Sequence, residues 1–224
     1  MLRVALAALT LVTFARPAAA QEDVQAWGTL TGTTGIAPGT ELSLELVTRA
    51  GDNAGGIYEI EFGGMVSHEI ARGVRVGVGY VRVPNYRDGA VSSIEDRPRQ
   101  QISASFPGIA GGTLSARVRL EERFRNTGSD MGLRMRPNVR WAVPLASGSP
   151  TRFFVQHESF ITLNSTDWGQ HAGYERWRNG LGLSTALAKS IDGEIGYLNQ
   201  RTFGRNGAPD RNDHVATLGL AVRF

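Results

Sequence analysis

The feature that most constrains the fold of this chain is an alternation of apolar and polar residues with a period of two. Residues 114–123 place leucine, alanine and valine on one face and arginine or glutamate on the other, and residues 133–143 and 177–187 repeat the pattern. Successive side chains of a strand point to opposite faces. Each segment therefore predicts a strand with one apolar face and one face of charged or very small residues. No stretch approaches 18 uninterrupted apolar residues, so the sequence predicts no transmembrane helix.

A soluble β-sandwich also alternates, with its apolar faces meeting in a core. Three features favour a membrane barrel instead: a polar face rich in arginine and glycine, aromatic residues near strand ends on the apolar face, and a chain that ends inside a strand. We therefore predict an all-β fold, a transmembrane antiparallel β-barrel over residues 21–224. The aromatic residues expected at the membrane interfaces are Trp27, Tyr80, Trp141, Trp177 and Tyr197.

The last strand, residues 213–224, carries a second signal. Phe224 ends the chain, Val222 precedes it on the same face, and Gly219 and Thr217 lie on the opposite face. This pattern resembles the C-terminal signal read by the outer-membrane barrel-assembly machinery. We expect that machinery to be a partner during biogenesis.

The number of strands is less simple to predict. Eleven candidates alternate with short turns on one side and longer polar connections, such as 84–96 and 202–212, on the other. This alternation places the N-terminus on the outer side, which does not suit a bacterial barrel with an even number of strands. We therefore favour 12 strands, with 10 as the alternative: either two strands are merged, or 24–34 does not cross like the others. Pro137 inside a strand is a further conflict, because a closed barrel has no free edge. The candidates lie near 24–34, 41–49, 57–67, 74–83, 97–106, 113–124, 133–143, 152–163, 176–187, 191–201 and 213–224.

Residues 1–20 have the composition of a cleaved signal peptide: Arg3, an apolar run at 4–14, and three alanines before Gln21. The alternative, an uncleaved anchor, is disfavoured because Arg16 and Pro17 interrupt the run early. We expect export to the outer membrane of a Gram-negative bacterium, with lipid and lipopolysaccharide as surroundings. Without the leader, 22 basic residues face 21 acidic ones, so we expect no nucleic-acid partner.

Several short motifs give the chain a family likeness. They are Trp27, the segment 41–45 with Arg49, the segments 117–123, 133–136, 158–160 and 176–181, and the Asp213–His214 pair. Their order resembles the uncharacterised bacterial outer-membrane family catalogued as domain of unknown function 2490. The resemblance implies a barrel in the outer membrane. It implies no activity and no catalytic residues.

The polar faces of the predicted strands carry an excess of arginine. Arginine forks hold carboxylates in bidentate pairs, so these side chains could form a closed charge network in a narrow lumen. Rings of arginine also favour anions in a channel. Our hypothesis is a small, weakly anion-favouring pore that passes small anionic solutes; the alternative is a non-conducting structural or loop-binding barrel closed by arginine–carboxylate pairs. The predicted inward arginines are Arg49, Arg75, Arg97, Arg99, Arg117, Arg119, Arg123, Arg134, Arg136, Arg140, Arg176, Arg178 and Arg223, and the inward acids are Glu41, Glu45, Glu59, Glu61, Glu121, Glu158, Asp192 and Glu194.

A barrel enzyme would need a nucleophile, a histidine and a carboxylate within hydrogen-bond reach. The segment His157-Glu158-Ser159 does not meet this need, because Glu158 faces away from its neighbours. His214 has no serine motif beside it, although Ser184 could lie near it in space. We therefore expect no enzyme, no catalytic residues, no metal site and no cofactor. The loop arginines Arg87, Arg205 and Arg211 could bind lipopolysaccharide phosphates.

Overall fold

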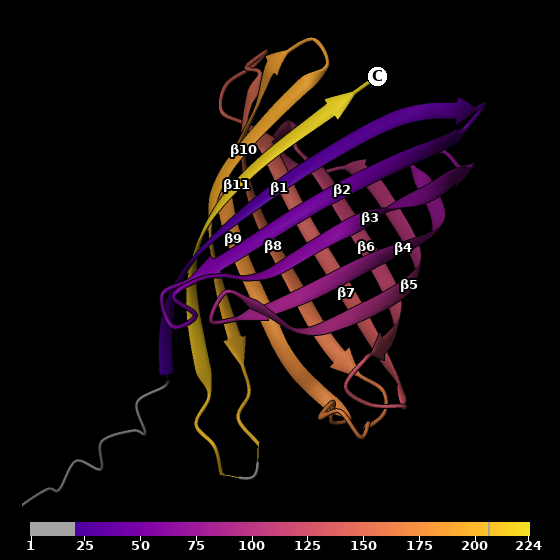
Figure 1. Ribbon diagram of the computed structural model, residues 1–224. Helices are drawn as coiled ribbons and strands as arrows, with labels where there is room; N and C mark the ends of the chain where they lie inside the picture. Colours follow the sequence, from indigo (N-terminus) through magenta and orange to yellow (C-terminus); the bar gives the residue numbers. More distant parts are fainter. Residues whose placement is uncertain (1–20, 206) are drawn as a thin grey trace, which may run out of the picture.

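The computed structural model describes residues 21–205 and 207–224, so the predicted signal peptide at 1–20 lies outside the described residues. Within them, eleven strands form a closed barrel (Figure 1), with one short 3-10 helix at Ile109–Gly111. The strands are β1 (Gln21–Ala37), β2 (Thr40–Gly51), β3 (Gly56–Ala71), β4 (Val74–Arg87), β5 (Ala90–Pro107), β6 (Thr113–Arg125), β7 (Met131–Pro144), β8 (Thr151–Thr162), β9 (Gly173–Ala188), β10 (Ile191–Thr202) and β11 (Arg211–Arg223).

The prediction of an all-β barrel is confirmed, and the preference for 12 strands, like its alternative of 10, is wrong. Each strand pairs antiparallel with the next, except that β1 and β11 close the barrel as a parallel pair, with Val24 opposite His214 and Leu30 opposite Leu220. An odd number of strands forces the first and last strands to run in the same direction. Parallel pairing therefore removes the need for a twelfth strand, and β1, which contains the candidate 24–34, spans the full wall.

Three prolines lie inside strands of this closed sheet. The register between β7 and β8 passes from Met135 to Asn138 and leaves out Pro137. The β5–β6 and β3–β4 registers have similar gaps at Pro98 and Pro84. A proline has no N–H to donate, so the ladder is interrupted on one side of each proline while pairing continues on the other. The barrel thus tolerates Pro137 without a free edge.

The connections define two different ends of the barrel. The loop end, at the bottom of Figure 1, has the connections 52–55, 88–89, 126–130, 163–172 and 203–210, and the turn end has 38–39, 72–73, 108–112, 145–150 and 189–190. The predicted long connection at 84–96 is wrong: β4 and β5 extend to a two-residue turn at Asp88 and Gly89, both with positive φ. The strand extension brings Glu95 into the barrel wall.

Most large apolar side chains of the barrel lie on the outside, and most of its buried side chains are polar or charged. Val78, Leu181, Ile195 and Leu218 are each 48–66% exposed on the outer wall, whereas Glu121 and Asp213 are fully buried in the interior. This distribution is the reverse of that in a soluble sandwich, where apolar faces meet in a core.

Trp27 corrects one expectation about the aromatic residues. Its side chain is buried in the interior beside Leu198 and Val215 and does not lie on the outer wall. Its position near a strand end suggested an interface, but its parity along β1 matches that of the buried Asp23 and Gln25. Tyr80 and Tyr197 do lie on the outer wall, each more than 40% exposed. No helix in the described segments is long and apolar enough to cross a membrane.

Candidate functional site

A layer of ion pairs crosses the middle of the barrel interior. Glu121, on β6, accepts hydrogen bonds from Arg134 Nε and Nη2 at 2.9 and 2.6 Å and from Arg136 Nη1 at 2.6 Å. Arg136 continues to Glu158 at 3.0 Å, and Glu158 also binds Arg117 at 2.5 Å. All of these side chains point inward because they share the lumen-facing parity of β6, β7 and β8.

A second group of pairs continues the layer on β3, β5 and β6. Glu61, on β3, bridges Arg97 and Arg99 at 3.2 and 3.1 Å. Glu95 binds Arg97 at 2.5 Å and Arg123 at 2.6 Å. Buried carboxylates are stable as anions only when paired and hydrogen-bonded, and each of these lies between two guanidinium groups. The layer therefore consists of two connected clusters of ion pairs, one around Glu121 and Glu158 and one around Glu61 and Glu95.

Aromatic rings support the network. Arg49 and Arg178 lie over the Trp27 ring, with guanidinium carbons 4.6 and 4.5 Å from its centroid. Arg136 and Arg178 lie at 4.5 Å from the centroid of Phe160. Cation–π contacts stabilise guanidinium groups that burial has removed from water. The buried aromatic residues thus act as supports for arginine inside the lumen.

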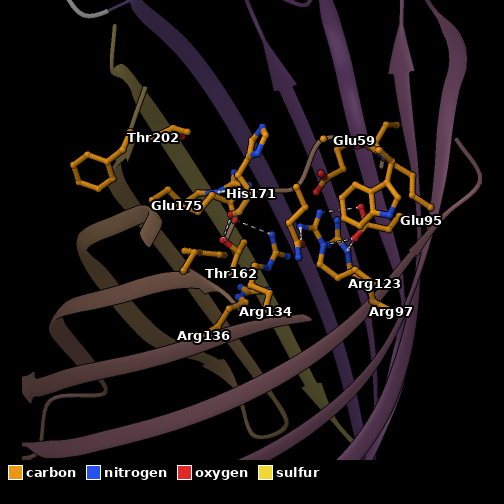
Figure 2. Close-up of a pocket in the computed structure, with 18 of the residues that line it drawn as sticks. Glu59, Glu95, Arg97, Arg123, Arg134, Arg136, Thr162, His171, Glu175 and Thr202 are labelled. Carbon is orange, nitrogen blue, oxygen red and sulfur yellow. Dashed lines mark hydrogen bonds and ion pairs between the residues drawn. The ribbon is translucent and has the colours of Figure 1, made fainter. Parts of the chain in front are cut away.

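The loop end holds a cavity of about 520 Å³ on its side of this layer (Figure 2). Figure 2 shows Glu95 beside Arg97 and Arg123 on one side, with Arg134 and Glu175 on the other. Ten arginines and three glutamates among the described residues line the cavity, which gives a formal excess of seven positive charges. The arginines are Arg49, Arg97, Arg123, Arg125, Arg134, Arg136, Arg176, Arg178, Arg205 and Arg211, and the acids are Glu59, Glu95 and Glu175.

Arg125 differs from most of its neighbours in this cavity, and only Arg205 of the described lining shares its lack of a carboxylate partner. The Arg125 guanidinium carbon lies 5.7 Å from the Trp168 ring centroid, and its buried Nε, like those of Arg49 and Arg136, has no hydrogen-bond partner among the described residues. Within the same part of the chain, no carboxylate lies within salt-bridge distance of it. A buried donor without a partner costs free energy unless a ligand satisfies it. Arg125 is therefore the cavity cation best suited to meet an anion.

The loops 126–130 and 163–172 clasp each other beside the cavity. Asp167 accepts hydrogen bonds from the backbone N–H groups of Ser129 and Asp130 at 2.8 and 3.2 Å, and Trp168 Nε1 donates to the Asp130 carbonyl at 2.7 Å. The backbone N–H of Ser129, followed by that of Asp130, holds the pKa of Asp167 below its usual range. Gln170 then reaches inward and accepts a bond from Arg123 Nη1 at 2.8 Å. The clasp fixes part of the cavity rim.

The structure pairs the predicted inward arginines with carboxylates in several separate clusters and pairs. Those outside the central layer also have partners: Arg75 binds Glu41 at 3.0 Å and Arg140 binds Glu194 at 2.6 Å. Arg119 is the exception, since its guanidinium binds the Gln101 side-chain oxygen at 2.9 and 3.0 Å and no carboxylate of the described chain. Further pairs join Arg99 to Glu45, Arg49 to Glu59, Arg134 and Arg176 to Glu175, Arg178 to Glu158, and Arg223 to Asp192.

Sequence reasoning missed several interior acids, among them Asp23, Glu95, Glu175 and Asp213. Glu95 lay in a predicted loop that is strand in the structure. Glu175 lies at an irregularity of β9, where the pairing with β8 shifts between Tyr174 and Arg176, so that Glu175 and Arg176 both contact lumen residues. Asp213 lies near the start of β11 on its inner face and accepts a bond from Gln200 Nε2 at 2.6 Å. The parity of β11 was a signal that could have identified Asp213.

The serine and histidine residues weighed as catalytic candidates do not all lie on the same face of the barrel wall. Ser184 lines an interior pocket, whereas His214 lies on the outer wall and contacts Tyr197 OH at 2.7 Å, so these two do not meet. Glu158 points into the lumen, as expected, and takes no part in a site with His157 and Ser159. His157 and Ser159 contact each other on the outer wall.

The remaining predicted positions lie along β11 and at the barrel ends. Thr217, Gly219 and Val222 belong to β11, and Phe224 follows it at the turn end, 84% exposed. Arg205 and Arg211 line the loop-end cavity, whereas Arg87 does not.

Comparison with known proteins gives a family and a relative. A family model described as a protein of unknown function, DUF2490, matches residues 24–212, which confirms the resemblance found in the sequence. An uncharacterized protein of Methylorubrum extorquens is 37% identical over 149 residues, or 66% of this chain. The chain covers 64% of the length of that relative.

Proposed function

The chain belongs to the DUF2490 family of proteins of unknown function, and on this premise we propose that it is an outer-membrane β-barrel that binds small anionic solutes in its loop-end cavity. The lumen is closed at mid-height by the ion-pair layer. The anionic solute would occupy the arginine-lined cavity between that layer and the loop end.

The inverted distribution of side chains supports the membrane location. A band of exposed valine, leucine, isoleucine and phenylalanine surrounds the barrel, and water would meet this apolar surface if the barrel were soluble. A transmembrane barrel has this arrangement, with an apolar outer band and a polar interior. Lipid and lipopolysaccharide of a Gram-negative outer membrane are the surroundings that we propose.

The charge of the loop-end cavity carries the proposal of anion binding. Glu61, Glu121, Glu158 and Asp213, behind the lining, pair several of its ten arginines, and among the described residues Arg125 and Arg205 are left without a carboxylate partner. Guanidinium forks bind carboxylates and phosphates in bidentate fashion. A cavity of about 520 Å³ falls within the range of small-molecule sites. Arg125, with its unsatisfied Nε, is the first residue that we expect such a ligand to contact.

The ion-pair layer supports a closed lumen. Arg99 is 1% exposed and Glu121 is 0% exposed, so water has little access at this height. A second candidate function, the small anion-favouring pore, is favoured by a further cavity at the turn end, which is lined by Arg75, Arg99 and Arg119. Conduction would require the layer between the two cavities to open.

Planar-bilayer conductance of the refolded mature chain separates these two functions. We expect a silent bilayer from protein shown to be folded by heat-modifiable migration on a gel. Discrete steps with anion preference in a salt gradient would refute the closed lumen and establish the pore. Fractionation of membranes from an expressing bacterium tests the location, because protein found outside the outer-membrane fraction would contradict it.

Titration calorimetry of the micellar barrel tests anion binding. We expect citrate and inorganic phosphate to bind, with affinity that falls as salt rises, and sucrose not to bind. Arg125→Gln should weaken citrate binding about tenfold or more, since one charge-assisted contact contributes about 1.5–3 kcal/mol. Arg87→Gln is the matched control, because Arg87 lies at the same end outside the cavity. Equal affinities of the two variants and the wild type would contradict the proposed site.

A further inference from the structure

Four side chains form a chain of hydrogen bonds on the outer wall of β8 and β9. His157 Nδ1 lies 2.7 Å from Asn179 Oδ1, and His157 Nε2 lies 2.9 Å from Ser159 Oγ. Ser159 Oγ lies 2.8 Å from the Tyr174 hydroxyl. His157 and Ser159 are two residues apart on β8, and Asn179 is the cross-strand partner of His157 on β9, so strand pairing holds the set together.

For a neutral imidazole with the Asn179 side-chain oxygen facing the ring, the donors and acceptors along this chain follow one direction. The Asn179 carbonyl oxygen can only accept, so His157 carries its ring proton on Nδ1 and leaves Nε2 as an acceptor. Ser159 Oγ–H then donates to Nε2, and the Tyr174 hydroxyl donates to Ser159 Oγ. A serine hydrogen-bonded to a histidine that a third group orients is the arrangement of an activated nucleophile, which is recognised by geometry and not by sequence position.

The position of this group on the barrel indicates its substrate. An apolar groove of about 480 Å³ runs along the outer wall, and His157 and Asn179 line it together with Val139, Trp141, Val155 and Leu181. The register places the row of His157, Asn179 and Asn199 on the loop-end side of the row of Val155, Leu181 and Tyr197. The polar row thus borders the apolar band, where the ester groups of lipids lie if the barrel spans a membrane.

We propose that Ser159, His157 and Asn179 form a hydrolytic site for acyl esters of membrane lipids, with the acyl chain in the outer-wall groove. The choice of substrate rests on the proposed membrane location. Ser159 Oγ attacks the ester carbonyl while its proton passes to His157 Nε2. His157 then protonates the leaving alcohol oxygen, and the acyl group remains on Ser159 as an ester. Water, deprotonated by His157, attacks that ester, releases the fatty acid and restores the serine.

Tyr174 and Asn179 have different roles in this scheme. The Tyr174 hydroxyl lies beside Ser159 Oγ, and it can donate a hydrogen bond to the oxyanion of the tetrahedral intermediate, as tyrosine side chains do in other sites. Asn179 is a positioning residue, since it contacts the histidine and holds the ring in the correct tautomer. Trp177, the cross-strand partner of Ser159, is the aromatic neighbour on the same face.

Covalent labelling tests the nucleophile directly. The refolded chain in detergent micelles is treated with an alkyl fluorophosphonate, and the modified peptide is identified by mass spectrometry. We expect phosphonylation of Ser159 that disappears in Ser159→Ala and falls strongly in His157→Ala. Folded wild-type protein without labelling at Ser159 overturns the proposal, and labelling that His157→Ala leaves unchanged does so as well.

Fatty-acid release from phosphatidylethanolamine in mixed micelles measures the activity. Ser159→Ala should lower it by about 10³-fold or more, and Tyr174→Phe by about 10²-fold. Asn179→Ala should lower kcat while Asn179→Asp restores it, a rescue that a purely structural role would not produce. Gln100→Ala, at a polar residue of β5 outside this groove, is the control and should retain full activity. Release that persists in Ser159→Ala overturns the proposal.

The same preparations separate this proposal from that of membrane location. Flotation of the chain with phosphatidylethanolamine vesicles tests insertion and requires no catalysis, whereas labelling and hydrolysis in micelles require no bilayer. Inserted protein with an unreactive Ser159 refutes the hydrolytic site alone. Reactive Ser159 in protein that does not insert refutes the membrane location alone.

Discussion

Replacing Glu121 with glutamine is expected to cause the largest loss of stability in the ion-pair layer. The carboxylate is fully buried and accepts three charge-assisted hydrogen bonds, two from Arg134 and one from Arg136. A hydrogen bond to a charged group contributes about 1 kcal/mol more than a neutral one, so the loss of charge removes about 3 kcal/mol from three bonds. The substitution also leaves the buried guanidinium groups of Arg134 and Arg136 without this carboxylate, which adds to the loss of stability. Removal of one partner of a buried ion pair costs about 3–5 kcal/mol.

The assay is urea unfolding of the micellar barrel, followed by tryptophan fluorescence. We expect Glu121→Gln to reduce the free energy of unfolding by about 3–5 kcal/mol. Glu194→Gln is the matched control: its pair with Arg140 is one-quarter to one-third exposed, and we expect a loss of at most about 1 kcal/mol. Equal losses in the two variants would refute the reasoning that burial sets the value of these pairs.

Two further predictions concern the barrel wall and the loops. Gly63→Ala should destabilise the barrel by about 1–3 kcal/mol, because a Cβ there would lie 2.1 Å from the Tyr80 carbonyl oxygen; Gly28→Ala, with open space around its Cβ, should show a much smaller change in the same unfolding assay. Asp167→Asn should speed amide hydrogen exchange at Ser129. Since the pKa of Asp167 in the folded protein is lowered, the wild-type clasp should persist as pH falls through the ordinary carboxyl pKa range and loosen only as pH falls through the lowered pKa. Loss of protection at the Ser129 amide at a pH above the ordinary carboxyl range would contradict this assignment.

The period-two pattern predicted most of the barrel because each strand has one face toward the lumen and one outside. Where the pattern is regular, as in 114–123, the facing of each side chain follows directly from the sequence. It fails where geometry departs from strict alternation. The irregularity at Glu175 and the extension of β5 to Glu95 both brought in acids that local periodicity did not indicate.

The closure of the barrel and the outer-wall hydrogen-bond chain depend on pairing between strands. No local pattern states that β1 pairs with β11, so the preference for an even number of strands came from a general rule and was wrong here. Glu158 does face away from His157, as the sequence predicts, but that reasoning looked for the third catalytic residue on the same strand. Asn179 comes from the neighbouring strand, and only the register between β8 and β9 brings it to the histidine.

The parallel pair of β1 and β11 has a consequence for the order of folding. Each of the other ladders joins strands connected by a turn or loop, and each of those can form soon after its two strands are made. The seam instead joins residues 21–33 to 211–223. The entropic cost of bringing these two segments together is small only after the other strands have paired and hold them near each other. Seam formation should therefore be the slowest step and the last, and until then both edges stay open. The chain has no cysteine, so a pair introduced at Leu30 and Leu220 would time that step by disulfide formation without background from native thiols.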